Sequence, residues 1–73
     1  MTAKQIIEMA LAYKGMNKTQ LASKLGWTKQ LFAARLETGK FTVDEWEAIG
    51  KAMECEVEIA FIFPDGRRVG LRQ

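Results

Sequence analysis

The sequence predicts a mainly helical domain with a small β element: four helices followed by a C-terminal β-hairpin. Three observations predict this fold class. Through residues 3–54, apolar side chains recur at the spacing of one helix face. From Glu56 the period changes to two, which is typical of a strand. Pro64-Asp65-Gly66 then indicates a turn into a second strand.

Each predicted helix begins at a side chain that accepts hydrogen bonds from the first turn. Thr2, Asn17 and Thr42 are each followed three residues later by Gln or Glu, which forms a capping box. Thr28 is the N-cap of the remaining helix, and Gly15, Gly26 and Gly39 follow helix ends. These signals predict helices over residues 3–14, 18–25, 28–38 and 42–54.

The apolar positions predict which helix faces are buried. Ile6, Ile7, Ala10 and Leu11 form the stripe of the first helix, with Tyr13 as a further candidate, and Leu21, Ala22 and Leu25 form that of the second. In the third, Leu31, Phe32, Arg35 and Leu36 share one side, on which Phe32 and Leu36 point inward and Arg35 lies on the flank. Trp46, Ile49, Gly50 and Met53 line the fourth. The aromatic residues are interpreted as core and not as a base-stacking platform: Trp27, Phe32, Phe41 and Trp46.

The hairpin is predicted to pair residues 56–63 with residues 67–72 through a three-residue loop. This register sets Phe61 opposite Val69, Ile59 opposite Leu71 and, on the other face, Glu58 opposite Arg72. A two-residue loop would instead set Phe61 against Gly70 and Ile59 against Arg72. The first register keeps one face apolar, so it is the one expected.

Length and composition restrict the function. The 73 residues, 48% hydrophobic and 27% charged, suit one globular domain spanning residues 1–73. There is no histidine and only one cysteine, Cys55, so zinc sites, Ser/His or Cys/His relays and internal disulfides are excluded. We expect no enzyme activity, no metal and no cofactor. The N-terminus lacks a signal-peptide pattern and no apolar run is long enough for a membrane, so a cytoplasmic protein is expected.

The net charge of +2 hides a division along the chain. Residues 1–40 contain seven basic and two acidic side chains, whereas residues 41–73 contain four basic and seven acidic ones. A polyanion would therefore meet the N-terminal half first. The alternative is that this charge division has no role in binding and only keeps separate faces of the protein soluble.

The segment from Asn17 to Lys40 carries the motif that indicates function. Leu21-Ala22, Gly26 and Thr28 lie at the offsets of a helix-turn-helix. Here the chain resembles the phage repressor and Cro-like family of DNA-binding domains (the xenobiotic-response-element type), over about residues 3–54. Trp27 and Arg35 depart from that pattern, since both stand where apolar aliphatic residues are usual. The resemblance implies a four-helix, lambda-repressor-like fold, outside which the hairpin lies.

The resemblance also implies how DNA would be bound. The helix of residues 28–38 would enter the major groove of double-stranded DNA, with base contacts from its outward face: Lys29, Gln30, Ala33 and Ala34. Phosphate contacts would come from Lys18, Thr28 and Lys40. Glu37 also points outward, and Arg35 is expected to form an ion pair with Glu8 or with an acid of the fourth helix.

We therefore expect a small homodimeric transcriptional regulator, most simply a repressor, that is associated with the nucleoid. The hairpin would be the dimer element, through a face made of Val57, Ile59, Phe61, Phe63, Val69 and Leu71. The alternative for this face is that it covers the chain's own helices, which would leave a monomer. The alternative for the whole chain is a protein-interaction module, of antitoxin or anti-repressor type, that binds a protein partner through the acidic helix 42–54 and the hairpin.

Overall fold

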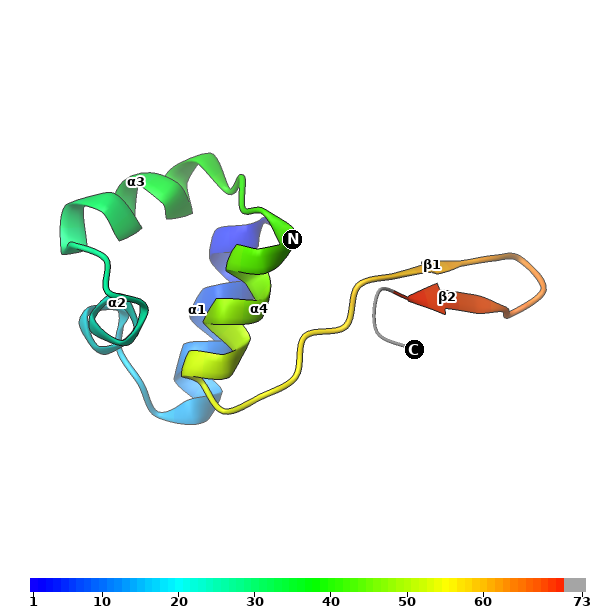
Figure 1. Cartoon of the computed structure of the whole chain (residues 1–73), viewed down its shortest axis with the longest axis horizontal. Coiled ribbons are helices and arrows are strands. Elements are labelled where there is room, and N and C mark those ends of the chain that lie inside the picture. The colour runs from blue at the N-terminus through cyan, green and yellow to red at the C-terminus, as the bar shows by residue number, and fades with distance from the viewer. Residues whose placement is uncertain (71–73) are drawn as a thin grey trace.

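The computed structural model describes residues 1–70 and contains four helices and a two-stranded antiparallel sheet (Figure 1). In chain order these are α1 (Ala3–Lys14), α2 (Lys18–Leu25), α3 (Lys29–Thr38), α4 (Val43–Ala52), β1 (Ala60–Ile62) and β2 (Arg68–Gly70). The predicted mainly helical architecture with a small β element is confirmed at this level. Among the described residues, no helix is long and apolar enough to span a membrane.

The predicted caps set the helix ends. Thr2, Asn17 and Thr42 each accept the N3 backbone N–H in a capping box, and the Thr28 hydroxyl accepts the N–H of Leu31 at 3.0 Å. The predicted starts at 28 and 42 are each one residue early, because the two threonines cap the helices from outside. The predicted end of the fourth helix at 54 is wrong. The helix stops at Ala52, and Glu54 adopts a left-handed φ of 57° that a helix cannot include.

One small core joins the four helices. It consists of eight residues whose side chains are at most 7% exposed: Ile7, Leu11, Leu21, Ala22, Phe32, Leu36, Ile49 and Met53. Trp27, Phe41 and Trp46 pack against it, so the prediction of a core role for the aromatic residues is confirmed. Ile6 and the further candidate Tyr13 were expected in the stripe of the first helix, but they are 47% and 96% exposed because they lie on the side of α1 away from Leu11. Leu31, expected on the same side of the third helix as Phe32, is likewise 44% exposed.

The hairpin has the predicted register but shorter strands. Phe61 pairs with Val69, and the Phe63 N–H donates to the Arg67 carbonyl at 2.8 Å across the Pro64–Gly66 loop. Gly66 takes the left-handed conformation that this loop requires, with φ 91°. The expected pairings with Leu71 and Arg72 lie outside the described residues.

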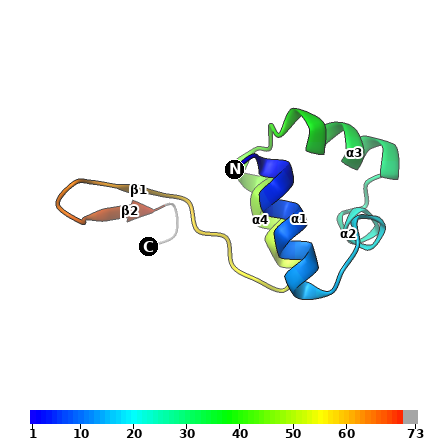
Figure 2. The same cartoon turned by 180° about the vertical axis from the view of Figure 1, so that it is seen from behind.

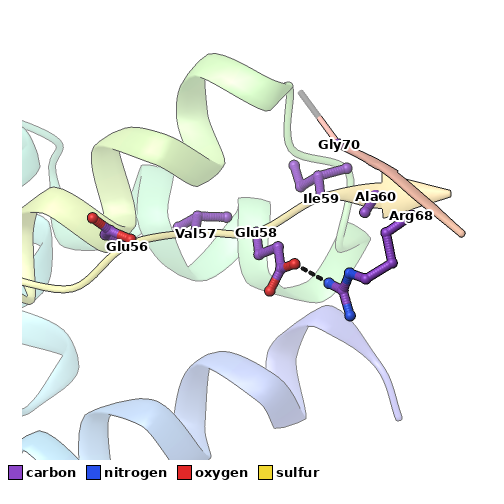
Figure 3. Close-up of a pocket in the computed structure, with 7 residues that line it drawn as sticks. All are labelled: Glu56, Val57, Glu58, Ile59, Ala60, Arg68 and Gly70. Carbon is purple, nitrogen blue, oxygen red and sulfur yellow. Dashed lines mark hydrogen bonds and ion pairs between the residues drawn. The ribbon is translucent and has the colours of Figure 1, made fainter. Parts of the chain in front are cut away.

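The predicted strand over 56–63 is too long, because β1 spans only Ala60–Ile62. Of the predicted strand over 67–72, Arg67 lies before β2, and residues 71 and 72 lie outside the described residues. Residues 56–59 form a connection between α4 and β1 and are not part of a strand. Within that connection Glu58 forms an ion pair with Arg68 of β2, and the two side chains point toward each other (Figure 3).

The hairpin stands away from the helices. It points to the side opposite α2 and α3 in both views, and the molecule measures 42 × 24 × 20 Å (Figures 1 and 2). Phe61 remains 75% exposed and Val69 46% exposed. The described hairpin thus does not cover the chain's own helices, which was the alternative expectation for its apolar face.

Gly50 fixes where the connection leaves α4. The Cys55 N–H donates to the Gly50 carbonyl at 2.9 Å, and Val57 packs where a Gly50 side chain would be. A Cβ at Gly50 would overlap Val57 Cγ2 and lie 3.2 Å from the Cys55 carbonyl oxygen. Val57, predicted as part of the dimer face, is accordingly half-buried against its own chain.

Candidate nucleic-acid interface

Helices α2 and α3 are joined by a three-residue turn, Gly26-Trp27-Thr28. Gly26 ends α2 with a left-handed φ of 75°, and the Trp27 N–H donates back to the Ala22 carbonyl at 2.9 Å. Ala22 is 2% exposed, so its small side chain lies inside the packing between the two helices. This turn fixes the direction in which α3 leaves α2.

The buried side of α3 fixes which residues face outward. Phe32 and Leu36 are 2% and 3% exposed and belong to the core. The residues predicted to contact bases all lie on the exposed part of the helix: Lys29, Gln30, Ala33 and Ala34. Leu31 is also 44% exposed. The structure thus places the predicted base-contacting residues together on one accessible surface.

A groove of about 240 Å³ runs beside this surface, between α3 and the first turns of α1 and α2. Its walls carry three lysines and one glutamate over an apolar floor: Lys4, Lys18, Thr19, Lys29, Phe32, Ala33, Leu36 and Glu37. We call this the lysine groove. Lys18 and Lys29, predicted from sequence, lie in it together. Lys4 and Thr19 were not predicted, because only the packing of α1 and α2 against α3 brings them there.

Two of these lysines are held by carboxylates. Lys4 Nζ lies 2.6 Å from Glu37 Oε1, and Lys18 Nζ lies 2.7 Å from Glu8 Oε2. The hydrogen bond from Lys18 lowers the pKa of Glu8, and the hydrogen bond to Glu37 raises the pKa of Lys4. Both pairs are partly solvent-exposed, so the lysines can exchange their carboxylate for another anion at little cost.

The other side chains predicted to contact phosphates or bases differ in whether they already form hydrogen bonds or ion pairs within the chain. The ammonium groups of Lys29 and Lys40 have no hydrogen bond or ion pair within the described residues 1–70, and both residues are exposed. The Thr28 hydroxyl already accepts the Leu31 N–H as the α3 cap. It retains a hydroxyl hydrogen that could be donated to a phosphate oxygen.

Arg35 fixes the C-terminal end of α3. Its guanidinium forms an ion pair with Glu45 of α4, donates to the Lys40 carbonyl at 2.9 Å, and lies 5.5 and 5.4 Å from the ring centres of Trp27 and Phe41. The predicted ion pair with an acid of the fourth helix is confirmed, whereas Glu8 pairs with Lys18 instead. The hydrogen bond from Arg35, with that from the Thr42 N–H, lowers the pKa of Glu45 to about 2.

In the comparisons with known proteins, no family model, no curated protein and no solved structure matches this chain. The described residues also contain no cluster of three or more side chains suited to holding a metal ion.

Proposed function

We propose that the protein binds double-stranded DNA in a sequence-specific manner, with α2 and α3 as a helix-turn-helix and α3 as the recognition helix. The observation that carries the proposal is the arrangement at α3. A short glycine turn directs the helix, its inner side is locked in the core, and its outer side presents Lys29, Gln30, Ala33 and Ala34 beside a groove lined with lysines.

The proposed base contacts follow from the chemistry of these side chains. A lysine suits the O6 and N7 acceptors of guanine, and a glutamine can bridge N6 and N7 of adenine. The methyl groups of Ala33 and Ala34 fit thymine methyls. The small alanines also let the helix approach the base edges closely, because no long side chain holds it away.

The proposed phosphate contacts flank the recognition helix. Lys18 lies in the first turn of α2, where backbone N–H groups and the helix dipole also favour an anion. Thr28 and Lys40 stand just before and just after α3. These groups would set the position of the helix on DNA without reading the sequence.

We further propose that two copies act together as a small transcriptional repressor. A single recognition helix reads few base pairs, whereas a two-fold dimer presents two helices to half-sites one turn apart. The hairpin is the proposed dimer element, since its apolar face is exposed and it points away from α3 (Figure 1). No catalytic step is part of this proposal.

The protein-docking module remains the second candidate, and one observation favours it. A shallow recess of about 750 Å³ on α4 and the following connection is lined mainly by acidic groups: Asp44, Glu47, Ala48, Lys51, Glu54, Cys55 and Glu56. Such a surface suits a basic protein segment. A docking module of this kind would show little duplex binding at any salt concentration, which separates the two candidates.

The test compares two substitutions in a DNA-binding assay with duplexes of varied sequence. Gln30→Ala should relax the preference at one base position, at a cost of about 1–3 kcal/mol for the preferred base. Lys40→Ala should weaken binding to all sequences alike and reduce the slope of log affinity against log salt by about 1.

Lys51→Ala is the matched control, because this exposed lysine lies on α4, away from the proposed interface. It should leave both sequence preference and salt slope close to those of the parent protein. Uniform and equal losses for Gln30→Ala and Lys40→Ala would refute the assignment of α3 to the major groove.

A further inference from the structure

The described chain is less compact than a self-sufficient domain of its size. Its accessible surface is 5563 Å², whereas a compact folded monomer of 8.3 kDa exposes about 4,600 Å². Its radius of gyration is 13.3 Å, against about 11 Å for a compact domain of this length. The excess surface is close to the roughly 800 Å² that each partner buries in a standard interface.

The exposed large apolar side chains fall mainly into two patches. One is the hairpin face, defined by Ile59, Phe61, Phe63 and Val69, which are 37%, 75%, 48% and 46% exposed. These residues share a face because Phe61 lies opposite Val69, and Ile59 and Phe63 lie two residues before and after Phe61, just outside the two ends of β1. The other side of the hairpin carries Ala60, the exposed Ile62 and the Glu58–Arg68 ion pair. Ile59 points away from this ion pair (Figure 3).

The second patch is a stripe along α1. Ile6, Met9 and Tyr13 follow one another at helical spacing on the side opposite the buried Ile7 and Leu11, and they are 47%, 60% and 96% exposed. We call this the α1 stripe. The positions three and four residues away along the helix, such as Gln5 and Ala12, are uncharged, and Glu8 lies at the edge of the stripe beside Met9.

The two patches cannot meet within one chain in this structure. The connection after α4 is anchored at Gly50 by the Cys55 N–H and by Val57, and the hairpin that follows points away from the helices (Figure 2). A two-stranded hairpin with both faces in water is only marginally stable by itself. A second copy supplies a matching surface, because each chain carries one hairpin face and one α1 stripe.

We propose that the protein forms a two-fold dimer by reciprocal exchange of hairpins, in which the hairpin face of each copy packs against the α1 stripe of the other. The arrangement covers both patches at once, and the same contact occurs twice by symmetry. It deepens the proposed function by assigning the dimer contact, but it does not depend on DNA.

The test is sedimentation of the pure protein without DNA. The parent protein should sediment as a species of twice 8.3 kDa. Phe61→Glu and Met9→Lys should each be monomeric, because each places a charge in both copies of the contact. Ile62→Glu, the matched control on the opposite side of β1, is 67% exposed and should remain dimeric. Helical circular dichroism should be unchanged in all variants, since the core lies elsewhere.

Mixing the two monomeric variants tests the reciprocity. A mixed dimer of Phe61→Glu with Met9→Lys has one unaltered contact and one contact that places Glu opposite Lys, so the dimer should return. A parent protein that sediments as a monomer at high concentration would overturn the proposal. A dimer that persists in Met9→Lys would also overturn it, because hairpins that pair only with each other leave α1 uninvolved. A parent protein that forms the dimer but does not bind DNA would support this dimer contact and count against the proposed function.

Discussion

At the scale of single residues, the carboxylates that pair with lysines of the lysine groove compete with the proposed phosphate ligand. Glu8 holds Lys18 at 2.7 Å and Glu37 holds Lys4 at 2.6 Å, while Lys29 is unpaired within the described residues. A phosphate that binds Lys18 must replace Glu8. Glu8 therefore limits how strongly the groove attracts any duplex, whatever its sequence.

Glu8→Gln should raise duplex affinity by about two- to fivefold for all sequences alike, because Lys18 no longer has to leave a carboxylate. The measurement is fluorescence anisotropy at moderate salt. Glu54→Gln is the control: it removes the same charge and releases Lys14, which lies 3.3 Å away but outside the groove. If both variants raised duplex affinity equally, the gain would come from the change in net charge and not from the release of Lys18.

A second residue-scale prediction concerns acid stability. The Arg35 and Thr42 hydrogen bonds lower the pKa of Glu45 from 4.5 to about 2 in the folded chain. Because the folded pKa is the lower one, the stabilisation by Glu45 is complete above about pH 4.5 and is lost as the pH falls through 2.

The free energy of unfolding of the parent protein should therefore exceed that of Glu45→Gln at neutral pH, and the difference should shrink between pH 4.5 and 2. Urea unfolding at a series of pH values measures it. Arg35→Met removes the largest cause of the lowered Glu45 pKa, so in that background the stability difference should be lost over a narrower pH range. A difference that stays constant through the window would contradict the role given to the pair.

At the scale of elements, Gly50 determines the path from α4 to the hairpin. Gly50→Ala should displace the connection at Val57, because the new Cβ would overlap the Val57 side chain and crowd the Cys55 carbonyl. We expect faster amide hydrogen exchange at Cys55 and a weaker dimer, with the α2 and α3 amides unaffected. Ala48→Gly, an exposed position on the same helix, is the comparison that isolates helix propensity. Unchanged exchange at Cys55 would show that the connection does not depend on this contact.

The elements that the sequence predicts best are those fixed by local chemistry. Thr2, Asn17, Thr28 and Thr42 are caps in the structure as predicted, since a side-chain oxygen satisfies N–H groups only three residues away. The hairpin register was predictable for the same reason: the Pro64–Gly66 loop length decides which residues pair.

Features set by tertiary packing could not be predicted in this way. Periodicity placed Ile6 with the core residues of α1, yet only the position of the neighbouring helices decides which edge of an apolar stripe is covered. Lys4 reaches the groove through an ion pair with Glu37, 33 residues later. Apolar and polar residues do alternate from Glu56, but residues 56–59 are not part of a strand in the structure. Alternation alone therefore predicted the start of β1 too early.

At the scale of the whole molecule, the proposed recognition helix and the hairpin lie at opposite ends (Figures 1 and 2). The helices α2 and α3 occupy the side away from the hairpin in both views (Figures 1 and 2). The charge is also divided along the chain, since residues 1–40 are basic and residues 41–73 acidic in balance, with most of these acids on α4 and the connection that follows it. The acidic part would be repelled by the duplex, which favours an approach with α3 toward the DNA.

The central claim is sequence-specific recognition of DNA, and selection from a random duplex library at moderate salt tests it most directly. The account predicts enrichment of a palindrome with half-sites about ten base pairs apart, because a two-fold dimer presents two α3 helices to successive turns of the major groove. Absence of any enriched sequence, with little duplex retained at any salt concentration, would contradict it.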